Sequence, residues 1–212
     1  MINDQTSIVF LIDDDASARR GLSRLISVAG FNIQAFASAE DFLASPHLSG
    51  PGCIILDVKM PGLSGPDLQA EMNKAEYSMP IIFISGHGDV PMTAQAMKEG
   101  ALDFLTKPVD RAHILNAIRN ALDKDRASRQ AYAELEQIRA KLTKLTPREF
   151  EVMKFVVAGL LNKQIGYTLG IAEDTVKIHR GRMMSKMGVV SVADLVRLTQ
   201  KAGVEPTDPD IK

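Results

Sequence analysis

Short apolar runs alternate with amphipathic segments over the first 122 residues, and this alternation constrains the fold more than any other feature of the sequence. Runs that are apolar almost throughout are typical of strands buried on both faces of a parallel sheet. The segments between them place apolar residues at helical spacing. The pattern predicts an α/β doubly wound five-stranded parallel sheet with helices on both faces. Strands are expected at 7–12, 31–36, 53–56, 80–85 and 102–106, and helices at 16–29, from Ser38, from about Pro66, at 91–99 and from Asp110.

A different pattern follows. From Arg111 to Thr146 no proline or glycine interrupts the chain, and a strongly polar stretch separates two groups of apolar residues at helical spacing. We expect a sheet-packing helix that extends into a long helical linker. Thr146 to Glu149 then form a capping-box sequence with proline at the first helical position. Four helices are expected at about 147–158, 162–169, 173–187 and 191–202. The predicted domains are a sheet domain at 1–122, a linker at 123–143, an all-α four-helix domain at 144–203 and a disordered tail at 204–212.

The net charge of −1 conceals two halves of opposite sign. Residues 1–122 carry nine basic and 14 acidic residues, whereas residues 144–203 carry ten basic and five acidic ones. A basic second half indicates a polyanionic partner. The single cysteine, Cys53, excludes an internal disulfide and a cysteine-based zinc site. Because no apolar run is long enough for a membrane helix and the first residues lack the pattern of a signal peptide, we expect a cytoplasmic protein with no membrane partner.

Acidic and hydroxyl side chains stand where the predicted strands end. Asp13 and Asp14 follow the first strand, Asp57 ends the third, Ser85 ends the fourth and Lys107 follows the fifth. The carboxyl ends of parallel strands meet at one edge of the sheet, which is where ligands bind in such folds. Carboxylates beside a lysine and a hydroxyl suit Mg²⁺ together with a phosphoryl group.

These residues carry a resemblance to a known family. Asp13-Asp14, Asp57 in LDVKMPGLSG, Ser85 in FISGHGD and Lys107-Pro108 resemble the receiver domain of two-component response regulators over residues 6–122. The stretch SGHGDVPMTAQAMKEGALDFLTKP is especially similar to the FixJ branch. The resemblance implies that the chain is not a free-standing enzyme but accepts a phosphoryl group from a sensor histidine kinase and forms a homodimer when phosphorylated.

The resemblance also assigns roles to single residues. Asp57 would be the phosphoacceptor, with Lys107, Ser85 and Asp13 completing the catalytic set. Mg²⁺ would be held by Asp14, Asp57 and the carbonyl of Lys59, with Asp13 binding a water of the metal. Ser85 and Phe104 would be the switching hydroxyl and aromatic residue. Asp15 is expected to begin the first helix, where its charge meets the helix dipole, and the Lys107–Pro108 bond is expected to be cis.

A haloacid-dehalogenase-type phosphatase is the alternative at this site. Asp13 would then be the nucleophile and Asp15 the acid, with Ser85 and Lys107 in the order that such an enzyme needs. That class also requires a further acidic pair after the lysine, and we find only Asp110 followed by a helix.

The basic half contains a series of short motifs: Leu145-Thr146-x-Arg148-Glu149, Gly159-x-x-Asn162-Lys163-x-Ile165, Leu169-x-Ile171, Thr175-Val176-Lys177-x-His179 and Lys186-Met187-Gly188. Together they resemble the LuxR-type helix-turn-helix. The resemblance implies double-stranded DNA as ligand, transcriptional regulation as function and RNA polymerase as a further partner. Two glycines depart from the family pattern. Gly166 stands where alanine is favoured, at a cost in helix stability, and Gly181 stands on the expected reading helix where a larger side chain is usual.

The 173–187 segment is the presumed reading helix. At 100° per residue Val176, Met183 and Met187 share one face and should pack inward. The opposite face would present Ile178, Gly181, Arg182 and Ser185. Lys177 could read guanine and Ile178 could contact a thymine methyl group. Phosphate contacts position a protein on DNA without reading the base sequence. The residues better placed for such contacts are Thr175, His179, Arg182, Lys186 and Lys163.

Arg180 does not fit this pattern, because its helical angle places it on the inward face. A buried guanidinium needs a partner. Glu149 and Glu151, on the first helix of this domain, are the nearest acidic candidates, and Glu149 belongs to the motif that carries the resemblance. We therefore predict a structural Arg180–Glu149 ion pair, with a contact between the side chain of Arg180 and a DNA phosphate as the alternative.

Overall fold

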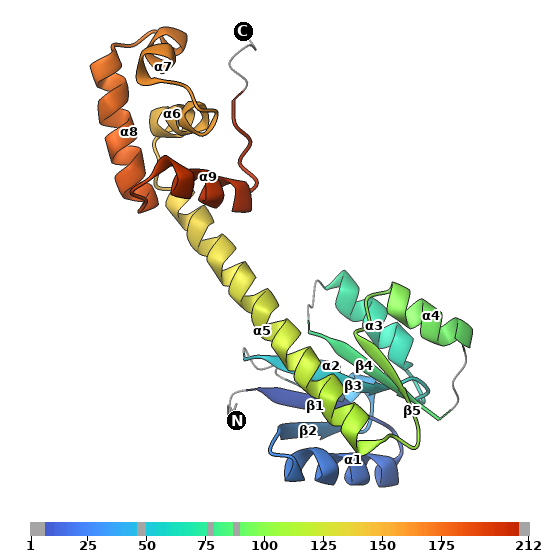
Figure 1. Cartoon of the computed structure of the whole chain (residues 1–212). Coiled ribbons are helices and arrows are strands. Elements are labelled where there is room, and N and C mark those ends of the chain that lie inside the picture. Colours follow the sequence, from blue (N-terminus) through green and yellow to red (C-terminus); the bar gives the residue numbers. More distant parts are fainter. Residues whose placement is uncertain (1–6, 46–49, 76–78, 87–89, 208–212) are drawn as a thin grey trace. The chain divides into compact units, whose positions relative to one another are not determined.

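The computed structural model describes residues 7–45, 50–75, 79–86 and 90–207. The chain divides into two compact units, residues 1–129 and 130–212 (Figure 1). Residues 123–129 of the predicted linker therefore belong to the first unit, and residues 130–143 belong to the second.

The N-terminal unit is a five-stranded parallel sheet, as the sequence pattern predicted, and its strand order is β2-β1-β3-β4-β5. Asp15 begins the first helix by accepting hydrogen bonds from the backbone N–H groups of Ser17 and Ala18, and Ser38 caps the second helix. The elements are β1 (Ile8–Ile12), α1 (Ala16–Val28), β2 (Asn32–Phe36), α2 (Ala39–Ala44), β3 (Gly52–Asp57), α3 (Gly65–Lys74), β4 (Ile81–Ser85), α4 (Val90–Lys98), β5 (Asp103–Thr106) and α5 (Arg111–Leu142).

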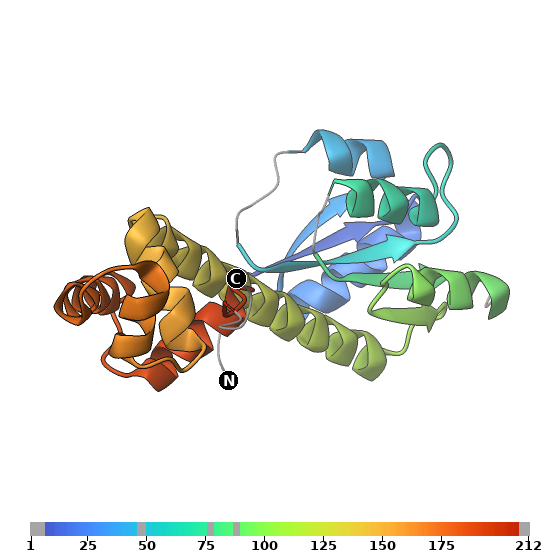
Figure 2. The same ribbon diagram turned by 90° about the horizontal axis from the view of Figure 1, so that it is seen from above.

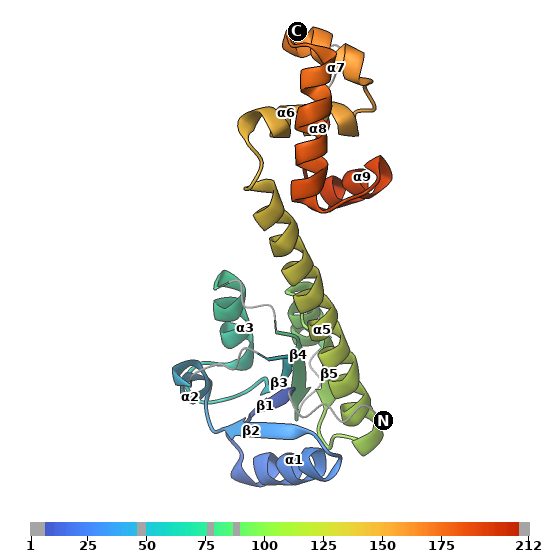
Figure 3. The ribbon, with the colours of Figure 1, turned by 90° about the vertical axis from the view of Figure 1, so that its left-hand side faces the viewer.

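Helices cover both faces of this sheet. On one face, α1 and α5 pack against side chains of β1, β3 and β4, with Ile26 and Ile114 fully buried (Figure 3). On the other face lie α2, α3 and α4, where α2 contributes Phe42 and α3 contributes Leu68 to the core. Figure 2 shows α2 and α3, coloured blue to teal, above the strands. The central strand β3 is buried along its whole length, which explains its uninterrupted apolar sequence.

A buried carboxylate extends the contact between α5 and the sheet beyond the last apolar residues. Asp125 is fully buried, and its Oδ2 accepts hydrogen bonds from the backbone N–H of Gly52 at 2.9 Å and from Nε of Arg129 at 2.7 Å. The N–H at the start of β3 thereby gains a partner that is 73 residues away in the sequence. Helix α5 is therefore part of the N-terminal unit well past the predicted domain boundary at residue 122.

The C-terminal unit contains the four helices that the sequence predicted. Thr146 and Glu149 form the expected capping box at the start of α6. The core of this unit contains Val152, Met183 and Leu195, and Ile138 and Glu134 of α5 belong to the same unit, with Glu134 bonded to Lys201. Figure 3 shows α8 with α7 near one end and α9 near the other. The helices are α6 (Pro147–Val157), α7 (Asn162–Leu169), α8 (Glu173–Met187) and α9 (Val192–Lys201).

Val204 packs against the C-terminal core, and its N–H donates to the carbonyl of Thr199. The predicted tail is therefore held at its first residue. Residues 208–212 of this tail lie outside the described part of the chain. Among the described residues, no helix combines the length and the apolar character that a membrane span requires.

Candidate functional site

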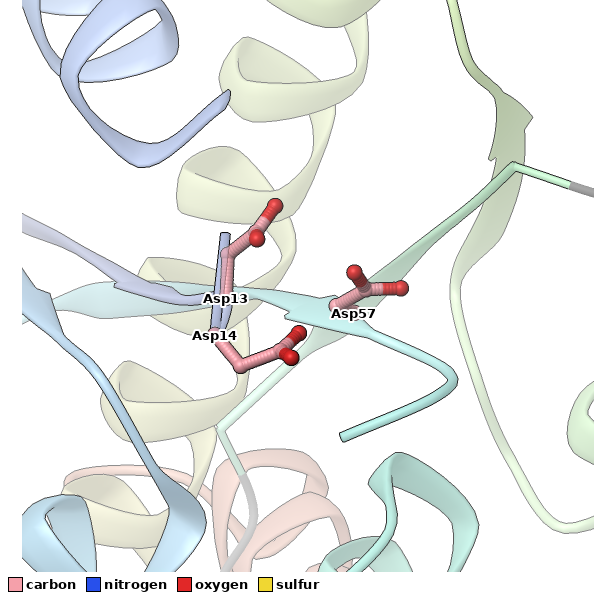
Figure 4. Close-up of side chains that lie close together, drawn as sticks. All are labelled: Asp13, Asp14 and Asp57. Carbon is pink, nitrogen blue, oxygen red and sulfur yellow. The ribbon is translucent and has the colours of Figure 1, made fainter. Parts of the chain in front are cut away.

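Three carboxylates meet at the carboxyl edge of the sheet. Asp13 and Asp14 follow β1 and Asp57 ends β3, and a carboxylate oxygen of each lies within 4.8 Å of the others (Figure 4). Asp13 is fully buried and Asp57 is 7% exposed, whereas Asp14 is exposed. Because β1 and β3 are neighbours in register, Ile12 lies opposite Leu56, and the residues that follow must come together.

Lys107 neutralises part of this negative charge. Its Nζ lies 2.6 Å from Oδ2 of Asp57 and 2.9 Å from Oδ2 of Asp13. Burial lowers the pKa of Lys107, but the hydrogen bonds to Asp57 and Asp13 outweigh this effect and raise the pKa overall. The pKa of Asp13 is raised overall, chiefly by burial and also by the charge of Asp57, although the hydrogen bond and charge of Lys107 act to lower it. A single cation thus bridges two carboxylates that would otherwise repel each other.

The neighbouring backbone fixes the position of Asp57. The N–H of Lys59 lies 3.4 Å from Oδ1 of Asp57. Helix α3 begins so close to this strand that a Cβ on Gly65 would lie 2.4 Å from the carbonyl oxygen of Asp57 and 3.0 Å from the ring of Phe83. Only glycine fits there without moving the strand end that carries Asp57.

The remaining predicted site residues lie at the ends of β4 and β5. Ser85 is 1% exposed, and its carbonyl oxygen accepts a hydrogen bond from the N–H of Lys107 at 2.7 Å. Phe104 is half-buried, with its ring centroid 6.3 Å from that of Phe83. The Lys107–Pro108 peptide bond is cis, which confirms the prediction.

The donor set fits a hard divalent cation. Carboxylate oxygens are the ligands that Mg²⁺ prefers, and Mg²⁺ usually combines one or two of them with water and phosphate oxygens. The exposed Asp14 leaves one side of the cluster open to such ligands. Asp15, which a phosphatase of the alternative class would need as its acid, is instead the N-cap of α1.

The presumed reading helix α8 has the two faces that the sequence predicted. Val176, Met183 and Met187 are fully buried. Ile178 is 53% exposed. Other exposed residues of this helix include Lys177, Gly181, Arg182 and Ser185, whereas Thr175 and His179 are half-buried.

Lys177 and His179 have more specific surroundings. Nζ of Lys177 lies 3.0 Å from Asp174, whose hydrogen bond and charge raise the pKa of Lys177. Nδ1 of His179 is buried and has no hydrogen-bond partner within the part of the chain that the structure describes. Lys163, at the start of α7, is exposed.

The predicted Arg180–Glu149 ion pair is wrong. Arg180 donates to Oδ1 of Asn162 at 2.9 Å, and buried Glu149 instead accepts from Nζ of Lys186 at 2.6 Å. The helical angle of Arg180 predicted the side of α8 on which this residue lies, but it did not predict which residues of other helices lie at the same height along α8. Six residues, or about 9 Å of helix, separate Arg180 from Lys186, and only Lys186 reaches the first turn of α6. The ammonium group of Lys186, a predicted phosphate contact, is therefore paired with Glu149 in this structure.

The pair also changes the chemistry of Glu149. The hydrogen bond from Lys186, with a second from the backbone N–H of Thr146, lowers the pKa of Glu149 to about 2. Thr146 and Glu149 thus cap α6 and hold α8 at the same time.

Sequence reasoning also misjudged or missed several residues. Gly166 is not merely a weak helix former, because a Cβ there would lie 2.8 Å from the carbonyl oxygen of Ile171. Arg148 donates to the carbonyl of Leu169 at 2.8 Å and links α6 to the end of α7. Arg148 and Asn162 both belong to the recognised motif, so the motif pointed to them without revealing their partners.

Comparisons with known proteins agree with this arrangement. Residues 9–119 match the response regulator receiver domain, and residues 143–199 match the luxR family of bacterial regulatory proteins. Nodulation protein W of Bradyrhizobium diazoefficiens is 46% identical over 198 residues, which are 93% of this chain and 87% of that protein. The transcriptional regulatory protein FixJ of the same organism is 40% identical over 197 residues, covering 92% of this chain and 96% of FixJ.

Solved structures give the same result. The structure of the response regulator StyR has a TM-score of 0.84 at 43% identity and covers 92% of this chain and 99% of its own. Full-length FixJ from B. japonicum has a TM-score of 0.56 at 40% identity, covering 92% and 97%. Of these proteins, FixJ is named a transcriptional regulatory protein and StyR a response regulator. The chain belongs to the response regulators of two-component systems, in the FixJ-like branch that joins a receiver domain to a LuxR-type DNA-binding domain.

Proposed function

We propose that Asp57 is the phosphoacceptor of this response regulator and that a sensor histidine kinase is the donor. The observation that supports this most strongly is the position of Asp57 at the end of β3, 2.6 Å from Lys107 and beside Asp13 and Asp14. In the transfer, a carboxylate oxygen of Asp57 forms a bond to phosphorus while the P–N bond to the kinase histidine breaks. The histidine nitrogen retains the electron pair of that bond.

The surrounding residues have separate roles in this proposal. Asp14, Asp57 and the carbonyl of Lys59 would hold Mg²⁺, and Asp13 would bind a water of the metal. When bound, Mg²⁺ supplies positive charge that offsets the negative charge of the phosphoryl oxygens. Lys107 meets a second phosphoryl oxygen by a charge-assisted hydrogen bond.

We further propose that Ser85 and Phe104 carry the change of state to the surface of the receiver. The Ser85 hydroxyl donates to the phosphoryl group, and the ring of Phe104 moves inward in response. The phosphorylated receiver then forms a homodimer, which places two reading helices on a two-fold DNA site. Residues 1–122 act as the receiver and residues 144–203 as the DNA-binding domain.

At the DNA, Lys177 and Ile178 read base edges in the major groove, and exposed Gly181 and Ser185 allow close approach of the helix. The phosphate contacts come from Thr175, His179, Arg182 and Lys163, whereas Lys186 and Arg180 hold the helix in place. The regulator acts in the cytoplasm, with RNA polymerase as the further partner.

The test is phosphorylation of the full-length protein by a small acyl phosphate in the presence of Mg²⁺, followed by mass mapping of the adduct. We expect one phosphoryl group on Asp57, and none in Asp57→Asn or after chelation of the metal. An adduct on Asp13, or continuous hydrolysis of phosphate esters, would contradict the proposal in favour of a phosphatase.

A further inference from the structure

Helix α2 reaches the loop that follows the phosphoacceptor. The β3–α3 loop, residues 58–64, contains Lys59, the proposed carbonyl ligand of Mg²⁺. Oε1 of Glu40, in the first turn of α2, accepts a hydrogen bond from the N–H of Leu63 at 3.0 Å. The hydrogen bonds that Glu40 accepts from its own N–H and from Leu63 lower the pKa of this carboxyl group, so it is ionised at neutral pH.

The helix that carries Glu40 is firmly held. Ala39 and Phe42, on either side of Glu40 in α2, are fully or almost fully buried. The ring of Phe42 packs edge-on against Phe10 and Phe36 at centroid distances of 5.6 and 5.5 Å. Glu40 is therefore a fixed point to which a neighbouring loop can be attached.

Gly62 lies against the same carboxylate. Its φ is +75°, and a Cβ on it would lie 2.6 Å from Oε1 of Glu40. The loop thus passes directly against the Glu40 carboxylate, and a larger residue at position 62 would have to displace that side chain from its bond to Leu63 as well as adopt a strained φ.

Backbone hydrogen bonds hold both ends of the loop, the first end to strand β4 and the second end back to the start of the loop. The N–H of Val58 bonds to the carbonyl of Ile84 at 3.0 Å, and the N–H of Gly65 bonds to the carbonyl of Val58 at 3.1 Å. Glu40 adds a hydrogen bond near the far end of the loop from another element. A loop fixed at its ends and at Leu63 has fewer conformations to lose when one of its carbonyls binds a cation.

We infer that Glu40 is a positioning residue for the cation site: it holds the β3–α3 loop in the conformation that binds Mg²⁺, without being a ligand itself. The inference rests on the proposed function, because it requires Mg²⁺ to bind beside Asp57.

Calorimetric titration of metal-free full-length protein with Mg²⁺ tests the inference without reference to activity. Glu40→Ala should weaken Mg²⁺ binding by about three- to tenfold, the range expected for one hydrogen bond. Glu40→Gln keeps an acceptor oxygen for the N–H of Leu63 and should stay within about twofold of wild type. The control is Glu71→Ala, which removes another exposed carboxylate, one that pairs with Lys74 within α3. The Mg²⁺ affinity of this variant should equal that of wild type.

Three outcomes are decisive. Wild type that binds no Mg²⁺ would overturn the proposed site together with this inference. Mg²⁺ binding that is unchanged in Glu40→Ala would overturn the inference alone. Equal weakening by Glu40→Gln and Glu40→Ala would also overturn it, because the effect would then come from charge and not from the hydrogen bond.

Gly62→Ala offers a cross-check. It should weaken Mg²⁺ binding in the wild-type background, and by a smaller factor in the Glu40→Ala background, where the collision with the carboxylate is gone and only the strain of positive φ remains. An equal loss in both backgrounds would mean that the contact between Gly62 and Glu40 does not matter for the site.

Discussion

Replacing Gly166 by alanine tests how closely α7 packs against the turn that leads into the reading helix. A Cβ on buried Gly166 would lie 2.8 Å from the carbonyl oxygen of Ile171. That oxygen belongs to the backbone, so it cannot rotate away as the end of a side chain would. Alanine is favoured over glycine in a helix interior by about 1 kcal/mol, whereas forcing a methyl group into a filled site costs about 1–3 kcal/mol. We expect Gly166→Ala to destabilise the C-terminal unit by about 1 kcal/mol.

Gly181→Ala is the matched control. Gly181 lies in the interior of α8, and a Cβ there would meet nothing within 4 Å. The same substitution should therefore stabilise the C-terminal unit by about 0.5–1 kcal/mol. Each kcal/mol shifts the melting temperature of a unit of this size by about 4–8 °C.

Calorimetry of the full-length protein measures both variants, with the transition of the N-terminal unit as an internal reference. Gly166→Ala should lower the melting temperature of the C-terminal unit, and Gly181→Ala should raise it. If Gly166→Ala raises that temperature as Gly181→Ala does, then α7 does not pack against Ile171 as closely as described.

Three further predictions concern other parts of the chain. Burial raises the pKa of the Cys53 thiol to about 12, so native protein should resist thiol reagents at pH 8 and react only on unfolding; rapid labelling of native protein would contradict this. Glu149 has a pKa of about 2 in the folded protein, against an ordinary value of 4.5. Its stabilising contribution is therefore complete above pH 4.5 and is lost as the pH falls towards 2. The difference in stability between wild type and Lys186→Met, measured by denaturation at each pH, should shrink over that interval, and a constant difference would refute the pairing. Binding of the full-length protein to duplex DNA should weaken steeply with salt, and Lys177→Ala should reduce the preference for one sequence over another in competition assays; an unchanged preference would remove Lys177 from base recognition.

Much of the architecture follows from local patterns in the sequence. Uninterrupted apolar runs such as the one ending at Asp57 mark strands buried on both faces, and the capping residues Asp15 and Thr146 mark where helices begin. Because parallel strands deliver their carboxyl ends to one edge, the meeting of Asp13, Asp57 and Lys107 could be expected before any coordinates were known.

Contacts between distant segments could not be predicted in the same way. The periodicity of a helix gives the angle of a residue around the axis but not its height relative to other helices, which is why Arg180 was paired with the wrong residue. The bond from Leu63 to Glu40 depends on the path of a loop, and the bond from Gly52 to Asp125 spans 73 residues. No local pattern encodes either contact.

The central claim is that a phosphoryl group on Asp57 controls DNA binding by the C-terminal domain. The most direct test is the affinity of the full-length protein for a duplex selected from a random library, measured at fixed salt with and without an acyl phosphate and Mg²⁺. We predict that phosphorylation raises the affinity of wild type by about fivefold or more, and that Asp57→Asn shows no gain under the same conditions. An equal gain in Asp57→Asn, or no gain in wild type that is fully phosphorylated, would contradict the claim.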